Sequence, residues 1–199
     1  MTSLGSEPVI LDAHPRDRGQ VLDHFNWVRG ETERLAAPLS AEDQVVQSMP
    51  DASPTKWHRA HVTWFFETMI LRAFAPGYEP LDPHYLFLFN SYYDAVGARH
   101  PRPARGLLTR PTADQVKAYR AHVDDAMRAL INDADDATWE KVAPMIALGL
   151  HHEQQHQELI LMDILHAFSH NSVAPAYQTY RAAPARKTPE LRWFDHDGG

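Results

Sequence analysis

The sequence contains no cysteine. A disulfide, a thiolate metal ligand, an iron–sulfur cluster and a cysteine nucleophile are therefore excluded. Any metal ion must be held by histidine or carboxylate side chains. Any sulfur chemistry must use a thiol that arrives with a substrate.

Long apolar runs are also missing. No run approaches the roughly 20 apolar residues that span a bilayer. Residues 1–17 show no basic start followed by an apolar stretch, so we expect no secretory signal. Positive charge is scarce, because 19 Lys and Arg against 26 Asp and Glu give a net charge of −7. Since no overall positive field attracts phosphates, we expect a cytoplasmic protein that binds neither nucleic acid nor membrane.

The 199 residues are 44% hydrophobic and 23% charged, which is typical of a globular domain. Four segments carry apolar residues every three or four positions, the spacing of one helical face. These segments are residues 15–36, 54–74, 112–132 and 138–170. No segment shows convincing strand alternation. The sequence therefore predicts an all-α, up-and-down four-helix bundle with each apolar stripe buried against the others.

Signals at the helix ends agree with these segments. Ser53 is expected to be the N-cap of the second helix, with Pro54 at its first position. Thr112 and Gln115 have the spacing of a capping box at the start of the third helix. Pro144 should either begin the main part of the fourth helix or kink it.

Two regions do not fit a simple bundle. Residues 75–111 form a connection much longer than a usual bundle loop, and long connections are often functional. A short helix is expected within it, after Asp82 and Pro83. Prolines interrupt residues 171–199. We therefore expect a helical domain over residues 1–170, followed by a linker.

Histidine is abundant, with thirteen in the chain and five of them within residues 151–170. His152 and His156 are four residues apart, which on a helix is a turn of about 400° and a rise of about 6 Å. Both imidazoles can therefore reach one metal ion from the same face. His61, on the inward stripe of the second helix, is the expected third ligand, and His58 is its competitor. Three imidazoles leave coordination positions open, and they suit Zn, Fe, Cu or Ni.

Other titratable residues near these histidines have different expected roles. His151 should point away from the site, because it lies 100° around the helix from its neighbour. His166 and His170 form a second pair, expected to be solvated or to cap the helix. Asp163 and Glu158 are candidates for acceptors that orient a ligand imidazole.

A rival motif lies on the same residues. Residues 152–156 read His-Glu-Gln-Gln-His, which matches the H-E-x-x-H pattern of zinc proteases. In those enzymes the glutamate, here Glu153, is a general base. No later histidine follows at the metzincin spacing, and no sheet is expected to hold a peptide. A hydrolase is therefore the less favoured interpretation.

Several motifs resemble those of ergothioneine-biosynthesis sulfoxide synthases, the EgtB-type enzymes. They are WHRAHVTWFFE at 57–67, FNSYYDAVG at 89–97, RHPRPARG at 99–106 and LHHEQQHQE at 150–158. They occur in order, and the similarity extends over essentially the whole chain. The resemblance implies a DinB-like four-helix bundle that forms the N-terminal half of such an enzyme. It also implies non-haem iron(II) held by His61, His152 and His156.

The resemblance further implies a reaction. These enzymes use O₂ to join the sulfur of cysteine or γ-glutamylcysteine to C2 of the hercynine imidazole and to oxidise that sulfur to a sulfoxide. Arg102 and Arg105 match a pair that binds the carboxylate of the sulfur donor. Gln155 resembles a residue on the hercynine side. Tyr92 and Tyr93 resemble active-site tyrosines, and a phenol there could donate a proton.

One departure from the family is large. Family members carry a second domain related to formylglycine-generating enzymes, which this sequence lacks. Residues 191–199, LRWFDHDGG, resemble the linker that enters that domain. Two alternatives stay open. The chain could be a DinB-family metal-dependent thiol transferase or hydrolase, or a non-catalytic module for metal binding or assembly.

Overall fold

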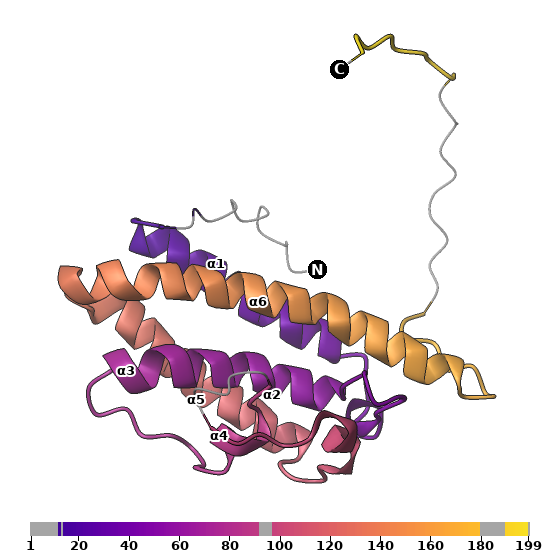
Figure 1. Ribbon diagram of the computed structural model, residues 1–199, viewed down its shortest axis with the longest axis horizontal. Helices are drawn as coiled ribbons and strands as arrows, with labels where there is room; N and C mark the ends of the chain where they lie inside the picture. Colours follow the sequence, from indigo (N-terminus) through magenta and orange to yellow (C-terminus); the bar gives the residue numbers. More distant parts are fainter. Residues whose placement is uncertain (1–11, 13, 92–96, 180–189, 199) are drawn as a thin grey trace.

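The computed structural model describes residues 12, 14–91, 97–179 and 190–198. Its regular structure is helical (Figure 1), and these residues contain no strand, which confirms the all-α prediction. The four long helices are α1 (Arg18–Ala36), α2 (Thr55–Phe66), α5 (Ala113–Asp133) and α6 (Asp136–Ser169). None of the helices in these ranges is long and apolar enough to cross a membrane.

The long helices pack side by side around a common apolar interior. α1 lies against α6, α6 against α2, α2 against α5, and α5 contacts α1 (Figure 1). The apolar stripes predicted from the sequence line this interior. Its fully buried members include Val21, Phe25, Val28, Val116, Tyr119, Val123, Met127, Ile146, Leu150 and Ile160. Burial of these side chains is what orients each helix about its own axis.

The start of α2 corrects one prediction. Its N-cap residue is Pro54, which has extended backbone angles of φ −60° and ψ 144° and makes no side-chain capping bond. The prediction of Ser53 as N-cap was therefore wrong, and the helix begins at Thr55. The Ser53 hydroxyl instead accepts a hydrogen bond from Arg105 Nη1 at 2.9 Å, and its N–H donates to Asp163 Oδ2 at 2.8 Å. Ser53 thus joins α6 to the long connection.

The second helical segment changes character after Phe66. A π-helical stretch, Glu67–Leu71, follows α2 and leads into the short α3, Arg72–Phe74. Glu67 is buried, and its carboxylate accepts hydrogen bonds from Tyr78 Oη at 2.6 Å and Tyr119 Oη at 2.7 Å. A buried carboxylate is costly without such donors. The two phenols therefore hold the π-helical stretch against α5.

The start of α6 excludes one of the two roles predicted for Pro144. The helix is capped by Asp135, whose carboxylate accepts from the Thr138 N–H at 2.7 Å. Pro144 consequently lies inside a helix that is already under way, and it does not begin the main part. The helix has His170 as its C-cap, at the last residue of the predicted range.

The remaining elements are short. One of them, η1, is a 3-10 turn at Asp43–Val45, whereas the long helix α1 begins after its N-cap Asp17. The connection from α3 to α5 contains α4 (Tyr85–Leu88), the short helix expected after Pro83, and the 3-10 helix η4 (Arg102–Leu107). The capping box predicted at Thr112 is confirmed, because both of its reciprocal hydrogen bonds with Gln115 are present.

Candidate metal centre

Two packed helices place three histidines together. His61 comes from α2, whereas His152 and His156 come from the facing side of α6. Each ring offers one nitrogen atom to the group, and these three nitrogens lie within 4.8 Å of one another. The structure thus brings together the three residues named from the sequence, and the group could hold a metal ion.

The spacing of the nitrogens matches metal coordination. Two nitrogens that each lie about 2.1 Å from one ion are about 3.0 Å apart at a right angle and about 3.4 Å apart at the tetrahedral angle. His61 Nε2 and His152 Nε2 are 3.2 Å apart, between these two values. Both nitrogens can therefore bind one ion with no backbone movement. A set of three imidazoles suits a late first-row transition metal.

The surroundings of His61 fix its ring and its tautomer. Its Nδ1 lies 2.6 Å from the carbonyl oxygen of Phe89. A carbonyl only accepts, so Nδ1 carries the proton and Nε2 keeps a lone pair toward the site. The rings of Trp57 and Trp64 stack on His61, with centroid distances of 4.6 and 5.6 Å. The imidazole is held ready to bind.

His58, the competitor for the third ligand position, lies beside His156 and outside the group of three. Its Nδ1 is 2.8 Å from His156 Nδ1, and its Nε2 is 3.0 Å from Asp163 Oδ2. Both ring nitrogens of His58 are therefore engaged. Asp163 is buried at this contact, whereas Glu158, the other proposed acceptor, is exposed.

Burial sets the protonation of all four rings. It lowers the pKa of His61 well below the usual value, and the neighbouring His152 adds to that shift. Burial lowers the pKa of His152 to about 4. It also lowers the pKa of His156 strongly, with His61 as the next contributor. Burial lowers the pKa of His58 too, although Asp163 opposes the shift. Neutral imidazoles are the form that binds metal ions.

The glutamate of the H-E-x-x-H motif faces a different partner. Glu153 is fully buried, and its carboxylate accepts from Arg29 Nη1 at 2.8 Å, Arg120 Nη2 at 3.0 Å and Thr32 Oγ1 at 2.6 Å. Two guanidiniums occupy both of its oxygens. Glu153 is therefore not placed as the general base that a zinc protease needs.

The two arginines named from the sequence lie in different environments. Arg105 is buried, with its guanidinium carbon 3.3 Å from the centroid of Trp57, and its Nη2 donates to Ser91 Oγ at 3.3 Å. Since Trp57 also stacks on His61, Arg105 is separated from a candidate ligand by one ring. Arg102 is exposed and donates to the backbone carbonyl of Asp51 through Nε and Nη2.

The other predicted site residues have varied positions. Gln155 is exposed on α6, directly before His156. Tyr92 and Tyr93 lie outside the described residues. His151 is exposed and its Nδ1 contacts Gln154 Oε1 at 3.2 Å, so it points away from the group of three as expected.

Sequence reasoning missed the link from His156 through His58 to Asp163. Asp163 follows His156 by seven residues, which is about two helical turns and keeps both on one face. A buried carboxylate and a spare histidine on the facing helix were the available signals. Their pairing depends on how α2 lies against α6, which no local spacing reveals.

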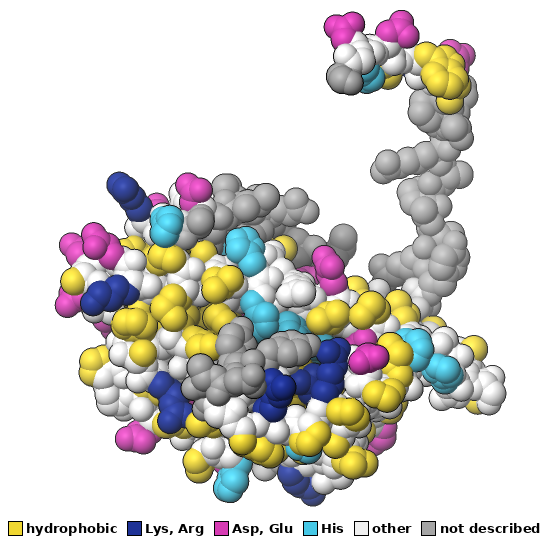
Figure 2. All heavy atoms as spheres, in the orientation of Figure 1, with side chains coloured by type: hydrophobic (Ala, Val, Ile, Leu, Met, Phe, Trp, Pro, Cys, Tyr) yellow, Lys and Arg dark blue, Asp and Glu magenta, His cyan; other side chains and the backbone are white. Residues whose placement is uncertain are grey.

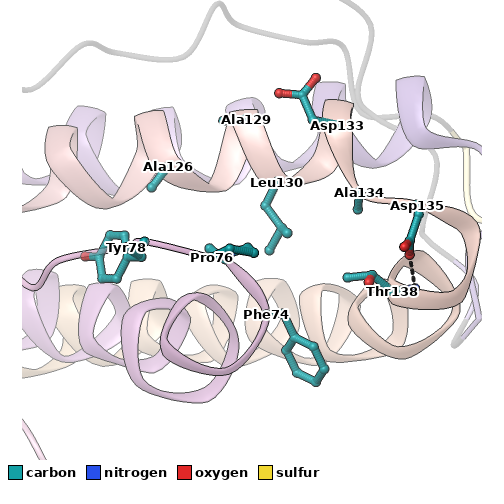
Figure 3. A pocket seen from close by; sticks show the side chains of 12 residues that line it. Phe74, Pro76, Tyr78, Ala126, Ala129, Leu130, Asp133, Ala134, Asp135 and Thr138 are labelled. Atoms are coloured by element: carbon teal, nitrogen blue, oxygen red, sulfur yellow. Dashed lines mark hydrogen bonds between the residues drawn. The ribbon is translucent and has the colours of Figure 1, made fainter.

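One hollow of the molecule lies away from the three histidines. It has a volume of about 550 Å³ and sits where α3, α5 and the start of α6 meet (Figure 3). Phe74, Pro76 and Leu130 give it mainly apolar walls, and Asp135 at its edge is engaged in capping α6 through Thr138. None of the three candidate ligands lines it.

The surface near the histidines is mixed. On the face shown in Figure 2, histidine side chains reach the surface next to Lys or Arg side chains near the middle of the molecule. Exposed apolar side chains of α6, Leu148, Met162 and Leu165, lie along the same helix.

The fold and this site define an all-α protein with a candidate three-histidine metal centre. The family model of the DinB superfamily matches residues 24–160, which include all three histidines. The chain therefore belongs to the DinB superfamily. A comparison with curated proteins gives no match.

Proposed function

We propose that this chain is the iron-binding part of an iron(II)- and O₂-dependent sulfoxide synthase of ergothioneine biosynthesis. The convergence of His61, His152 and His156 is the observation that carries the proposal. The four motifs shared with EgtB-type enzymes support it, since three of them supply His61, Arg105 and the α6 histidines. The mutual packing of α1, α2, α5 and α6 supports the four-helix bundle that the resemblance implies.

The residues present fit a bound iron(II). Three neutral imidazoles would hold it through ring nitrogens and leave positions open for a substrate. When bound, the iron would let O₂ act as a four-electron oxidant. In the overall reaction a C–S bond replaces the C2–H and S–H bonds. One oxygen atom would be added to the sulfur, and the other would leave as water. The Phe89 carbonyl keeps His61 in its binding tautomer, and the stacked Trp57 holds the ring in place.

Arg105 is the residue best placed to bind the sulfur donor. Its guanidinium lies over Trp57, beside the histidines, and a guanidinium can grip a carboxylate with two hydrogen bonds. This contact would orient the donor with its thiol toward the metal. Arg102, the fourth residue of the same motif and at the surface, would bind a second carboxylate or guide the donor inward.

The remaining groups complete the proposed pocket. Gln155, exposed beside His156, would face the hercynine side. Tyr92 and Tyr93 would supply a phenolic proton donor. Residues 1–170 would form the metal-binding domain, and residues 171–199 would lead to a domain related to formylglycine-generating enzymes. Leu191 and Trp193 are exposed in that segment, as a linker that packs on another domain would require.

Metal binding is the first test. The chain is loaded with iron(II) without oxygen, and the iron per chain is measured after removal of excess metal. A single tightly bound iron is expected in the wild type and in His151→Ala, because His151 is exposed and its ring contacts Gln154. His152→Ala should lose it. Full iron retention by His152→Ala would overturn the assigned centre.

Product formation is the second test. The iron-loaded chain is given hercynine, O₂ and either cysteine or γ-glutamylcysteine, with and without a separately produced formylglycine-generating-enzyme-like domain. Mass spectrometry should detect the hercynyl sulfoxide of the donor. Iron binding without any such product in either mixture would contradict the sulfoxide synthase and leave the metal centre intact.

A metal-dependent thiol transferase is the second candidate. The family match supports it, because that match identifies the DinB superfamily and no subfamily within it. Such an enzyme would use the same three histidines to bind a thiol and transfer it to an electrophilic carbon without O₂. The mixtures described above separate the two functions when they are prepared without oxygen. With an electrophile that carries a leaving group added to these mixtures, loss of the free thiol and release of that group without oxygen would favour a transferase.

A further inference from the structure

Behind one candidate ligand lies a line of three buried side chains. His156 Nδ1 contacts His58 Nδ1 at 2.8 Å, and His58 Nε2 contacts Asp163 Oδ2 at 3.0 Å. The same carboxylate oxygen accepts from the Ser53 N–H at 2.8 Å. His58 is 2% exposed and Asp163 is 7% exposed. Water therefore has little access to these contacts.

The carboxylate fixes every proton in this line. The Asp163 oxygen only accepts, so His58 must donate through Nε2–H. A neutral His58 then has a lone pair at Nδ1, and His156 must donate to it through its own Nδ1–H. His156 consequently keeps its lone pair at Nε2, the nitrogen left for a metal ion. One charge at the end of the line thus sets the tautomers of two imidazoles.

We propose that His58 and Asp163 are positioning residues that hold His156 in its metal-binding tautomer. The inference rests on the metal centre of the proposed function and is independent of its sulfoxide chemistry. The hydrogen bonds also polarise His156, because electron density is pushed from the carboxylate through His58 toward the ligand nitrogen. His61 has a neutral carbonyl as its outer partner, so this carboxylate support is specific to His156.

The arrangement also locks two helices together. α2 supplies a ligand, His61, and a support, His58. α6 supplies a ligand, His156, and a support, Asp163. Each support acts across the interface, because His58 holds His156 and Asp163 holds His58. A shift of α2 along α6 would therefore break the line and misplace the ligands together.

The test measures cobalt(II) affinity by competition with a chelator, together with the cobalt absorption spectrum. His58→Leu removes both hydrogen bonds and should weaken binding by roughly 10–100-fold. His58→Gln should keep most of the affinity, since a glutamine amide has an oxygen that accepts from His156 and an N–H that donates to Asp163. Asp163→Asn removes the charge and should shift the spectrum with a smaller loss.

Two controls separate positioning from folding. His151→Leu changes an exposed histidine next to a ligand and should leave affinity unchanged. Urea unfolding of each metal-free variant shows whether the fold persists. If His58→Leu does not fold, the comparison of Asp163→Asn with His58→Gln decides. The inference would be overturned if Asp163→Asn and folded His58→Leu both kept the cobalt affinity and spectrum of the wild type. If the wild type itself did not bind cobalt, the metal centre would be overturned.

A second, separate pair of histidines lies at the far end of α6. His166 Nε2 and His170 Nε2 are 3.3 Å apart, with ring centroids 4.7 Å apart. This spacing falls within the range of about 3.0–3.4 Å for two nitrogens on one ion. The Ser48 hydroxyl lies 2.8 Å from His166 Nδ1 and holds that ring, which directs Nε2 toward His170.

The geometry points to a second, weaker site for zinc, nickel or copper at His166 and His170. His170 is exposed and His166 is half-buried, so water can complete the coordination. Two protein ligands bind less tightly than three, and the site should fill after the first. It depends on neither the proposed function nor the His58 line.

Zinc titration by calorimetry tests the second site. The wild type should bind two ions of different affinity, and His170→Gln should bind only the tighter one. His122→Gln, which changes a half-buried histidine of α5, is the control and should bind two. Binding of a single zinc by the wild type, or of two zincs by His170→Gln, would overturn this inference. The His170→Gln background also isolates the first site for the cobalt measurements.

Discussion

Glu153 Oε2 accepts a hydrogen bond from Arg29 Nη1 at 2.8 Å, at a place where the two side chains are 0% and 2% exposed. This pair joins α1 to α6 directly beside the candidate ligand His152. Arg120 of α5 and Thr32 of α1 complete the hydrogen bonds of the carboxylate. Buried charge therefore links three helices behind the metal centre.

We expect Glu153→Ala to lower the free energy of unfolding by roughly 3–5 kcal/mol, because it leaves two buried guanidiniums without their carboxylate. Urea unfolding monitored by circular dichroism measures the change. Glu158→Ala, at an exposed position on the same helix, should stay within about 0.5 kcal/mol of the wild type. Equal unfolding midpoints for the two variants would show that the cluster is not stabilising.

Acid should destabilise the metal-free protein. Burial alone would raise the pKa of Glu153, but Arg29 and Arg120 outweigh it and hold the pKa below its ordinary value of 4.5. Arg120 and Arg59 likewise outweigh burial and lower the pKa of Glu33. A lowered pKa contributes stability above the unfolded value, and that stability is lost as the pH falls through the folded value.

Urea unfolding between about pH 7 and about pH 3 tests this expectation. The free energy of unfolding should fall with pH below the ordinary carboxyl value. Glu153→Gln removes one of these two carboxyl groups, so its stability should depend less steeply on pH below the ordinary carboxyl value. A slope equal to that of the wild type would exclude Glu153 as a source of the acid sensitivity.

Gly149→Ala should destabilise the protein by roughly 1–3 kcal/mol through overpacking. A Cβ atom at this position would lie 2.7 Å from Phe66 Cε1 and 2.9 Å from Phe65 Cε1. Phe65 also packs on His152, with ring centroids 5.0 Å apart, so metal affinity should fall as well. Thermal unfolding and cobalt titration measure the two effects.

Gly30→Ala is the matched control for that change. Gly30 also lies within a helix, but a Cβ atom there would meet nothing within 4 Å. Helix propensity alone should then raise stability by about 0.5–1 kcal/mol. If both variants are more stable than the wild type, the close contact of α6 with Phe65 and Phe66 does not restrict the side-chain size at position 149.

Arg105→Met should weaken binding of cysteine to the cobalt-loaded chain and leave cysteamine binding unchanged. Cysteamine carries the thiol and lacks the carboxylate that Arg105 is proposed to grip. The growth of sulfur-to-cobalt absorption with added thiol gives both affinities. An equal loss for the two thiols would mean that Arg105 acts by packing on Trp57, which it contacts directly.

Local patterns in the sequence determined the helices and most of the ligand set. The apolar stripe that includes Val21 and Phe25 and the capping box at Thr112 depend on residues within a few turns of one another. The same holds for His152 and His156, because helix geometry alone places them on one face. The prediction of Ser53 as a helix cap was wrong, because its hydrogen-bond partners are Arg105 and Asp163. Both are distant in sequence, so no local pattern indicates them.

Only the tertiary structure decided which residues meet across the helices. His58 and His61 lie on nearly the same side of α2, and the contact with α6 places His61 next to His152 and His58 next to His156. Gly149 lets the α6 backbone lie against Phe66 of α2, which brings the helices this close. The physical reason is that hydrogen bonding along the chain sets a helix, whereas the packing of side chains from separate helices sets its rotation against a neighbour.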